Sequence, residues 1–376
     1  MRSKWIMLIV IILVLTAGFL FYQMTRTDNV RIRKMKNNIA TTKIAEITET
    51  SAVAKRDLSE YIKLSDSMLI TGLAQDSIPP LESPEYTTVE EANNFLEDWD
   101  QVFVLEGMTH TYIYPQKIMV WHEIVNEEID GEAISITYCP LTASAIGYIG
   151  EEGNTYGTSG NLLNSNLVMY DRKSNSNIPQ ILGVGVDSDL SGVTLKTKPI
   201  LWADWADVAA MYPKANVLSL ETSHTRDYFQ DPYGSYSPLT KTSYYQTGEP
   251  MFPLLNDNLT DIDDKKVVVG VKYDKNVIAL DPNKVEEMRV LNFEVGNHPA
   301  VAIYDTDLKT VRVYSAMLAD KKITLKYIEK TIFDESGREW QAKGVSKSGE
   351  SLTPITHFDV FWFAWQAYYS SSEIIE

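Results

Sequence analysis

The sequence contains very little cysteine and histidine: one cysteine, Cys139, and five histidines in 376 residues. A single cysteine permits no disulfide bond within the chain, so the cysteine count does not indicate an oxidising compartment. The spacings H-x-H, H-x-x-x-H and C-x-x-C, which support a metal site, are also absent. Cys139 is therefore interpreted either as a buried core residue or as a group with a chemical role.

Positive charge is scarce outside the N-terminal region. The formal net charge of the chain is -17, while residues 1–76 hold 11 Lys and Arg against 7 Asp and Glu. Residues 77–376 consequently carry a net charge of -21. Because binding to a phosphate backbone requires Lys and Arg, this balance excludes nucleic acid as a partner.

The chain has one long uncharged apolar run, Trp5 to Tyr22. As a helix its 18 residues would extend about 27 Å, enough to span a hydrocarbon core. The alternative, a cleaved signal peptide, would end at small residues, but the candidate site Thr16-Ala17-Gly18 is followed by further apolar sequence. We therefore predict an uncleaved transmembrane signal-anchor over residues 1–24, with the lipid bilayer as the partner of residues 5–22.

The basic residues leave the orientation of this anchor open. Arg2 and Lys4 precede the run, whereas a larger basic group follows it, at Arg26, Arg31, Arg33, Lys34 and Lys36. The positive-inside rule would keep the C-terminal side in the cytoplasm, but the same group could lie on anionic headgroups from outside. We expect a single-pass membrane protein with its folded domain outside the cytoplasm, mainly because of the family resemblance given below.

The remainder of the chain predicts an α+β, β-dominated domain. Residues 25–76 are polar with helical apolar spacing and are interpreted as a partly helical stalk, and the prolines that follow open a domain over residues 77–376. Short runs rich in β-branched residues then alternate with Gly, Asn and Asp. Thr87-Thr88-Val89-Glu90-Glu91-Ala92 is interpreted as an N-cap followed by a short helix to Glu97. Further helices are expected at Trp202–Met211, Asn283–Glu287 and Phe358–Tyr369.

The domain carries the signature of an internal duplication. Half one, about 100–221, resembles half two, about 267–376, and residues 222–266 form a linker. The matching pairs are Pro115/Pro282, Asn126/Asn292, Tyr138/Tyr304, Cys139/Asp305, Tyr148/Tyr314, Asp171/Asp334, Trp205/Trp362 and Tyr212/Tyr369. Features found in one half only, such as Cys139 and His122, are therefore candidates for function.

Two kinds of site are compatible with these residues. Cys139, after a predicted strand, could supply a thiolate nucleophile or metal ligand with His122 as its base or co-ligand, and copper is the metal that soft ligands would suit. Both could equally be structural. A glycine- and amide-rich loop from Tyr156 could instead bind a sugar, peptide or anion, together with charged and aromatic residues nearby; the residues concerned are Ser159, Asn161, Asn164, Asn166, Asp171, Arg172, Arg226, Asp231 and Tyr233.

Several stretches resemble the family named domain of unknown function 3179. They are IPPLESPEYTTVEEANNFL, WHEIVNEEIDG, ITYCPLTASAIGY, YGTSGNLLNSNLVMYDR, RDYFQDPYGSY and FWFAWQAYYS, which lie within residues 77–376. The resemblance implies an exported or membrane-anchored prokaryotic protein and assigns no activity. Many members read CPLC, whereas Thr142 stands at the second cysteine position here, which argues against a dithiol or C-x-x-C metal role.

Taken together, the sequence predicts a membrane-anchored extracytoplasmic module that binds a glycan, a peptide or an envelope protein. The alternative is a thiol-dependent enzyme or a copper-type site centred on Cys139 and His122. No cofactor is required by the sequence, and whether the protein is an enzyme stays open.

Overall fold

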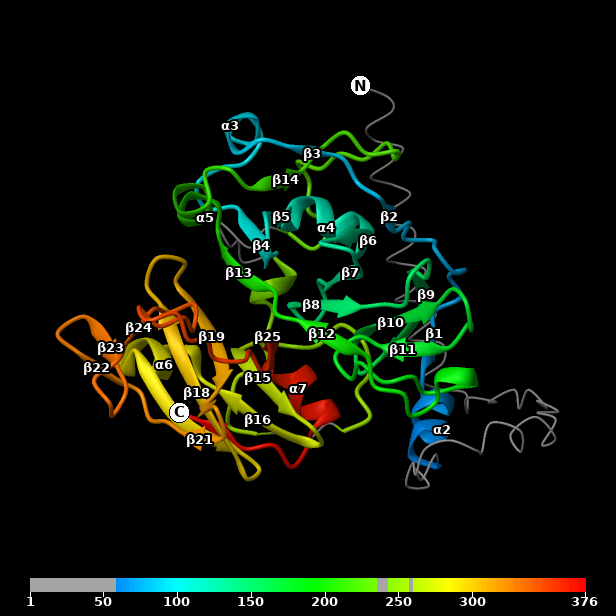
Figure 1. Ribbon diagram of the computed structural model, residues 1–376. Coiled ribbons are helices and arrows are strands. Elements are labelled where there is room, and N and C mark those ends of the chain that lie inside the picture. Colours follow the sequence, from blue (N-terminus) through cyan, green and yellow to red (C-terminus); the bar gives the residue numbers. More distant parts are fainter. Residues whose placement is uncertain (1–58, 235–242, 257–259) are drawn as a thin grey trace. The chain divides into compact units, whose positions relative to one another are not determined.

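Short strands dominate the computed structural model, which describes residues 59–234, 243–256 and 260–376 (Figure 1). Residues from Leu58 to the C-terminus form one compact unit. No helix in the described ranges is long and apolar enough to cross a membrane. The predicted anchor, residues 1–24, and most of the predicted stalk lie outside the described residues.

The helices are all short. The described part of the chain contains α2 (Ser59–Asp66), α3 (Val89–Ala92), α4 (Gln116–His122), α5 (Trp205–Met211), α6 (Pro282–Met288) and α7 (Trp362–Tyr368), with 3-10 turns η1 (Ser188–Leu190) and η2 (Tyr244–Gln246). The β-dominated α+β class is thus confirmed. Thr88 caps α3 through a capping box with Glu91, as its sequence predicts. Helix α4 was not predicted, because its apolar run KIMVW also suits a strand.

Half one and the segment that precedes it form three sheets. Their strand orders are β13 (Leu201–Asp204), β4 (Gln101–Glu106), β5 (Thr111–Pro115), β14 (Asn216–Leu218), β3 (Tyr86–Thr87); then β12 (Lys196–Lys198), β8 (Ser144–Ile149), β7 (Glu132–Cys139), β6 (Ile124–Ile129), β2 (Leu81–Glu82); and β1 (Leu69–Ile70), β9 (Tyr156–Leu163), β10 (Asn166–Asp171), β11 (Asn177–Pro179). Strand β1 pairs with β9, so the end of the predicted stalk packs against the domain.

Half two repeats much of this order. Its sheets are β25 (Thr356–Phe361), β15 (Val267–Tyr273), β16 (Asn276–Leu280), β26 (Ile374–Ile375); β17 (Val290–Val295), β18 (His298–Asp305), β19 (Thr310–Ser315); β20 (Met317–Leu318), β21 (Lys321–Lys322); and β22 (Lys326–Ile328), β23 (Thr331–Phe333), β24 (Glu339–Trp340). The order β25-β15-β16-β26 corresponds to β13-β4-β5-β14, and β17-β18-β19 corresponds to β6-β7-β8.

Individual contacts recur at related positions, about 166 residues apart. Helix α6 begins 166 residues after α4, and each helix ends in a residue with positive φ, Glu123 at 59° and Arg289 at 63°. Asn126 hydrogen-bonds both backbone groups of Tyr156, and Asn292 does the same to Leu325. At this offset Cys139 corresponds to Asp305.

The two halves meet along equivalent strands. Strand β13 packs near β19, and β8 packs near β25. At the first contact the buried Arg312 guanidinium binds both carboxylate oxygens of Glu106, at 2.6 and 3.2 Å, and Asp305 at 2.8 Å. At the second, Lys272, which corresponds to Glu106, donates to the carbonyls of Ile181 and Leu182. The halves therefore form one folded unit whose interior holds the predicted site.

Candidate functional site

Cys139 lies in a hairpin tip that is wholly buried. Residues 139–144 connect β7 to β8, and every one of them is buried. Hairpin tips usually face water, but here the Phe361 N–H donates to Thr142 O and the Tyr244 hydroxyl to Leu141 O. Half two and the linker thus cover the tip.

The polar side chains around the tip satisfy one another. Gln180 accepts hydrogen bonds from Ser144 Oγ and Asn166 Nδ2 and donates to Thr137 Oγ1. Asn166 also donates to Thr142 Oγ1. A fully hydrogen-bonded buried network of this kind rigidifies and specifies a core. The Asn166 side chain therefore makes its hydrogen bonds within the protein, to Thr142 in the tip and to Gln180.

The Cys139 thiol is not activated in this structure. Its sulfur accepts a hydrogen bond from the Leu167 N–H at 3.3 Å, and its side chain is 1% exposed. Burial, assisted by the nearby charge of Glu123, raises the pKa of the thiol to about 11. A reactive cysteine has its pKa lowered by a positive neighbour, so Cys139 is held here as a neutral thiol.

His122, the predicted partner of Cys139, belongs to a different set of contacts. Its Nδ1 lies 2.7 Å from Pro79 O, so this nitrogen donates, and its Nε2 accepts from the Tyr228 hydroxyl at 2.6 Å. Tyr228 in turn lies 2.6 Å from Thr222 Oγ1. No hydrogen bond joins His122 to Cys139 in the described structure, and their pairing stays a prediction.

The buried position of His122 predicts that the stability of the fold decreases in acid. Burial lowers the pKa of His122 to about 4, below the ordinary value of about 6.5. The neutral ring stabilises the fold above pH 6.5, and this stability is lost as the pH falls toward 4. The unfolding free energy of the unaltered protein should decrease between pH 6.5 and pH 4. In His122→Gln we expect this decrease to be smaller by about 1–3 kcal/mol. Chemical denaturation at several pH values measures this, and an unchanged pH profile would contradict it.

The predicted ligand-binding loop is a strand instead. Residues 156–163 form β9, paired with both β1 and β10, and the missing side chain of Gly157 makes room for the Tyr170 ring and Asp76. Ser159 Oγ donates to Val168 O, and Asn164 Nδ2 donates to Ala367 O. The Asn161 N–H donates to Ser159 Oγ. The loop was wrongly predicted because its Gly and Asn residues are also typical of turns.

The predicted charged residues are separated. Asp171 is buried and accepts from Ser174, while Arg172 ion-pairs with Asp76 and Glu82. Arg226 is half-buried and donates to the Thr225 carbonyl. These three residues therefore do not converge on one ligand site.

The linker tyrosines pack inside the unit. Asp231 accepts from Gln116, from the Tyr245 hydroxyl and from the Tyr233 N–H. The Tyr233 ring meets Tyr244 edge-on at 5.9 Å, and Tyr244 and Tyr245 are buried.

Glu123 is a buried residue that the sequence pattern did not indicate. It follows α4 in the left-handed conformation and is 6% exposed. Burial raises the pKa of its carboxyl to about 8. Its backbone carbonyl accepts from the Tyr138 N–H at 2.7 Å, which places it beside the end of β7. Comparison of the two halves offers one indication that Glu123 is unusual. At the equivalent position half two has Arg289, which is half-buried and lies 5.0 Å from the Tyr304 ring.

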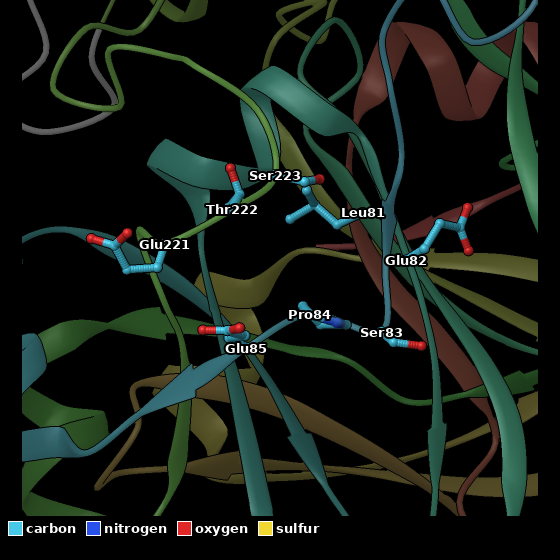
Figure 2. A pocket seen from close by; sticks show the side chains of 8 residues that line it. All are labelled: Leu81, Glu82, Ser83, Pro84, Glu85, Glu221, Thr222 and Ser223. Carbon is cyan, nitrogen blue, oxygen red and sulfur yellow. The ribbon is translucent and has the colours of Figure 1, made fainter.

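An open hollow lies on the surface, and one of its lining residues, Thr222, contacts the same Tyr228 hydroxyl that His122 binds. It has a volume of about 360 Å³ and is lined by Leu81, Glu82, Ser83, Pro84, Glu85, Glu221, Thr222 and Ser223. Figure 2 shows Glu85 and Glu221 on one side of the hollow and Glu82 on the other. We call it the acidic hollow, because its lining residues include three glutamates and no Lys or Arg.

The described residues contain no group of three His, Cys, Asp or Glu side chains that could hold a metal ion. The copper-type site predicted at Cys139 and His122 therefore has no third ligand of these types within the described ranges.

Comparison with known proteins gives a family and no activity. The model of the family described as "Protein of unknown function (DUF3179)" matches residues 75–372. No curated protein and no solved structure matches the chain.

Proposed function

The chain belongs to the DUF3179 family of proteins of unknown function, and we propose that it is a membrane-anchored, extracytoplasmic module that binds a positively charged partner. The binding site we propose is the acidic hollow. The partner would be a basic segment of a peptide or an envelope protein.

The observation that carries this proposal is the charge of the hollow. Three glutamates line a volume of about 360 Å³, within the range of ligand sites. Within the part of the chain that the structure describes, Glu82 alone of the three is ion-paired, to Arg172. The surrounding domain, residues 77–376, has a net charge of -21, which attracts cations over a longer range. A glycan is less well supported, because Ser159, Asn164 and Asn166 already bond within the protein.

A thiol-dependent activity that pairs Cys139 with His122 is also less well supported. The thiol is neutral and covered, and both ring nitrogens of His122 have partners. His122 is better explained as a structural residue whose two hydrogen bonds hold Pro79 and Tyr228 in place.

We further propose that the two halves arose by internal duplication. The repeated sheet orders, the shared positive φ after α4 and α6, and the equivalent contacts of Asn126 and Asn292 support a common origin. Where the two halves carry different residues at equivalent positions, one half has then diverged from the other and is a candidate for function.

Titration with spermidine, as a cationic probe, tests the proposed binding site. We expect the full-length chain in detergent micelles to bind spermidine by calorimetry, and Glu85→Gln with Glu221→Gln to weaken binding by about tenfold or more. Binding should also weaken as salt is raised, because it depends on exposed charge.

The matched control is Glu329→Gln, which removes one exposed glutamate on the β22–β23 hairpin, outside the hollow. This variant should bind like the unaltered chain. Equal affinities in all variants would show that the acidic hollow is not the binding site.

A further inference from the structure

A second hollow lies in half two, between two turns that connect strands. It has a volume of about 380 Å³ and is lined by Tyr273, Asp274, Lys275, Asn276, Val295, Gly296, Asn297 and His298. The first four of these residues form the turn between β15 and β16, and the last four form the turn between β17 and β18. We call it the two-turn hollow, and it shares no lining residue with the acidic hollow.

Half one builds the same pair of turns and ties them together with a carboxylate. The turn from Gly107 to His110 connects β4 to β5, and Asp130 lies in the turn between β6 and β7. The Asp130 carboxylate accepts hydrogen bonds from the Met108 N–H at 2.5 Å and from Thr109 Oγ1 at 2.9 Å. One acidic side chain therefore joins the two turns of half one.

Half two keeps the donor turn but lacks this acceptor. Gly296 stands 166 residues after Asp130 and has no side chain. The turn that faces it has Asp274 and Lys275 at its two central positions. Within the described structure the Asp274 N–H makes no hydrogen bond, and the Lys275 ammonium makes no ion pair. The groups that would bind a carboxylate are thus present without one.

A ring stack holds the two turns of half two in place of the carboxylate. The rings of Tyr273 and His298 lie 3.6 Å apart and are nearly parallel, at 11°. His298 Nε2 also lies 2.9 Å from Ser315 Oγ, which helps to fix the ring. Half one has Gly107 and Glu132 at the equivalent positions, so the stack belongs to half two alone. The wall of the two-turn hollow is therefore preformed, as in most small-molecule sites.

Two side-chain amides and one opposite pair of charges complete the lining. Asn276 is half-buried and Asn297 is exposed, and neither side chain makes a hydrogen bond within the described ranges. Gly296 makes room for the Asn276 amide, since a Cβ there would come within 2.5 Å of the amide carbon. Among the lining residues Lys275 is the only Lys or Arg, and Asp274 is the only acid; both are exposed.

We propose that the two-turn hollow binds a small molecule through a single carboxylate. The ligand carboxylate accepts hydrogen bonds from the Asp274 N–H and the Lys275 ammonium, as Asp130 accepts from the equivalent turn. The bond from the ammonium is charge-assisted and therefore stronger than one between neutral groups. The amides of Asn276 and Asn297 pair with uncharged polar groups of the ligand. Because the Asp274 carboxylate adjoins Lys275, a second negative charge on the ligand is disfavoured.

Calorimetric titration of the full-length chain in detergent micelles with N-acetylglycine tests this proposal. This probe has one carboxylate and one amide, and N-acetylglycinamide is the matched probe without the charge. We expect saturable binding of N-acetylglycine that weakens as salt is raised, and binding of N-acetylglycinamide that is weaker by about tenfold or more. Equal binding of the two probes, or no saturable binding of N-acetylglycine, would overturn the proposal.

Two substitutions transfer residues of half one into the two-turn hollow. Lys275→Thr removes the cation and should weaken N-acetylglycine binding by about tenfold. Gly296→Asp supplies the carboxylate that Asp130 supplies in half one, and it should abolish binding because this carboxylate competes for the same donors. Asp130 has a φ of 53°, so the φ of 61° at Gly296 is one that an aspartate adopts in this fold.

The matched control is Lys321→Thr, which removes an exposed lysine on β21, outside the two-turn hollow. This variant should bind N-acetylglycine like the unaltered chain. Urea denaturation of each variant checks that the fold is kept. An affinity for N-acetylglycine that is unchanged in both Lys275→Thr and Gly296→Asp, or equally reduced in Lys321→Thr, would show that the probe does not bind in this hollow.

Discussion

Replacing Glu123 by Gln is expected to stabilise the protein at pH 8 by roughly 3 kcal/mol. The pKa of this carboxyl is about 8 in the folded state, against about 4.3 when unfolded. A raised pKa of this kind stabilises the fold fully below pH 4.3, and the contribution is lost as the pH rises toward 8. Gln keeps the shape of the protonated acid and cannot ionise, so it avoids this loss.

Urea denaturation of both proteins at pH 4.5 and at pH 8 measures this effect. The two proteins should have similar unfolding free energies at pH 4.5 and diverge as the pH rises. Glu329→Gln, on an exposed turn, should follow the unaltered chain at both values. Destabilisation by Glu123→Gln at pH 8 would mean that the carboxylate has a favourable partner that its burial does not indicate.

Replacing Arg312 by Ile is expected to destabilise the protein by about 3–5 kcal/mol, because it leaves the buried Asp305 carboxylate without its cation. Arg312 is 3% exposed and binds Asp305 and Glu106 together, which joins half two to half one. An exposed pair such as Lys322–Glu294 should contribute at most about 1 kcal/mol when broken.

The double variant Asp305→Cys with Arg312→Ile gives the sharper measurement. It reproduces in half two the residues that half one has at these positions, Cys139 and Ile146. We expect it to lose less stability than Arg312→Ile alone, since replacing a buried pair by apolar groups is often nearly neutral. If the losses of stability in Asp305→Cys and Arg312→Ile simply add in the double variant, the two residues are not coupled, and this expectation is contradicted.

The sequence predicted the strand content, because alternation of apolar residues is a local property. Asn126 and Asn292 could be paired from sequence since each holds the same backbone contact in its half. Helix α4 was missed because five of its residues, KIMVW, fit a buried strand as well as a helix. Here the tertiary packing decided between them.

The site was harder to predict because burial depends on distant segments. The Cys139–Ser144 tip looks like an exposed turn, and only contacts from Tyr244 and Phe361 show that it is covered. Ser159 and Asn166 were chosen as ligand groups, but their partners, Val168 O and Gln180, are brought to them by the pairing of strands. Glu123 gave no local signal, and its comparison with Arg289 was the one available indication.

The central claim is that the acidic hollow faces outside the cytoplasm and binds a cation. Ser223 lines the hollow and is exposed, so Ser223→Cys in a Cys139→Ala background places a single label there. We predict that a membrane-impermeant maleimide labels this cysteine in intact cells and that spermidine slows the labelling. Labelling only after the cells are lysed, at a rate that spermidine does not change, would contradict both parts of the claim.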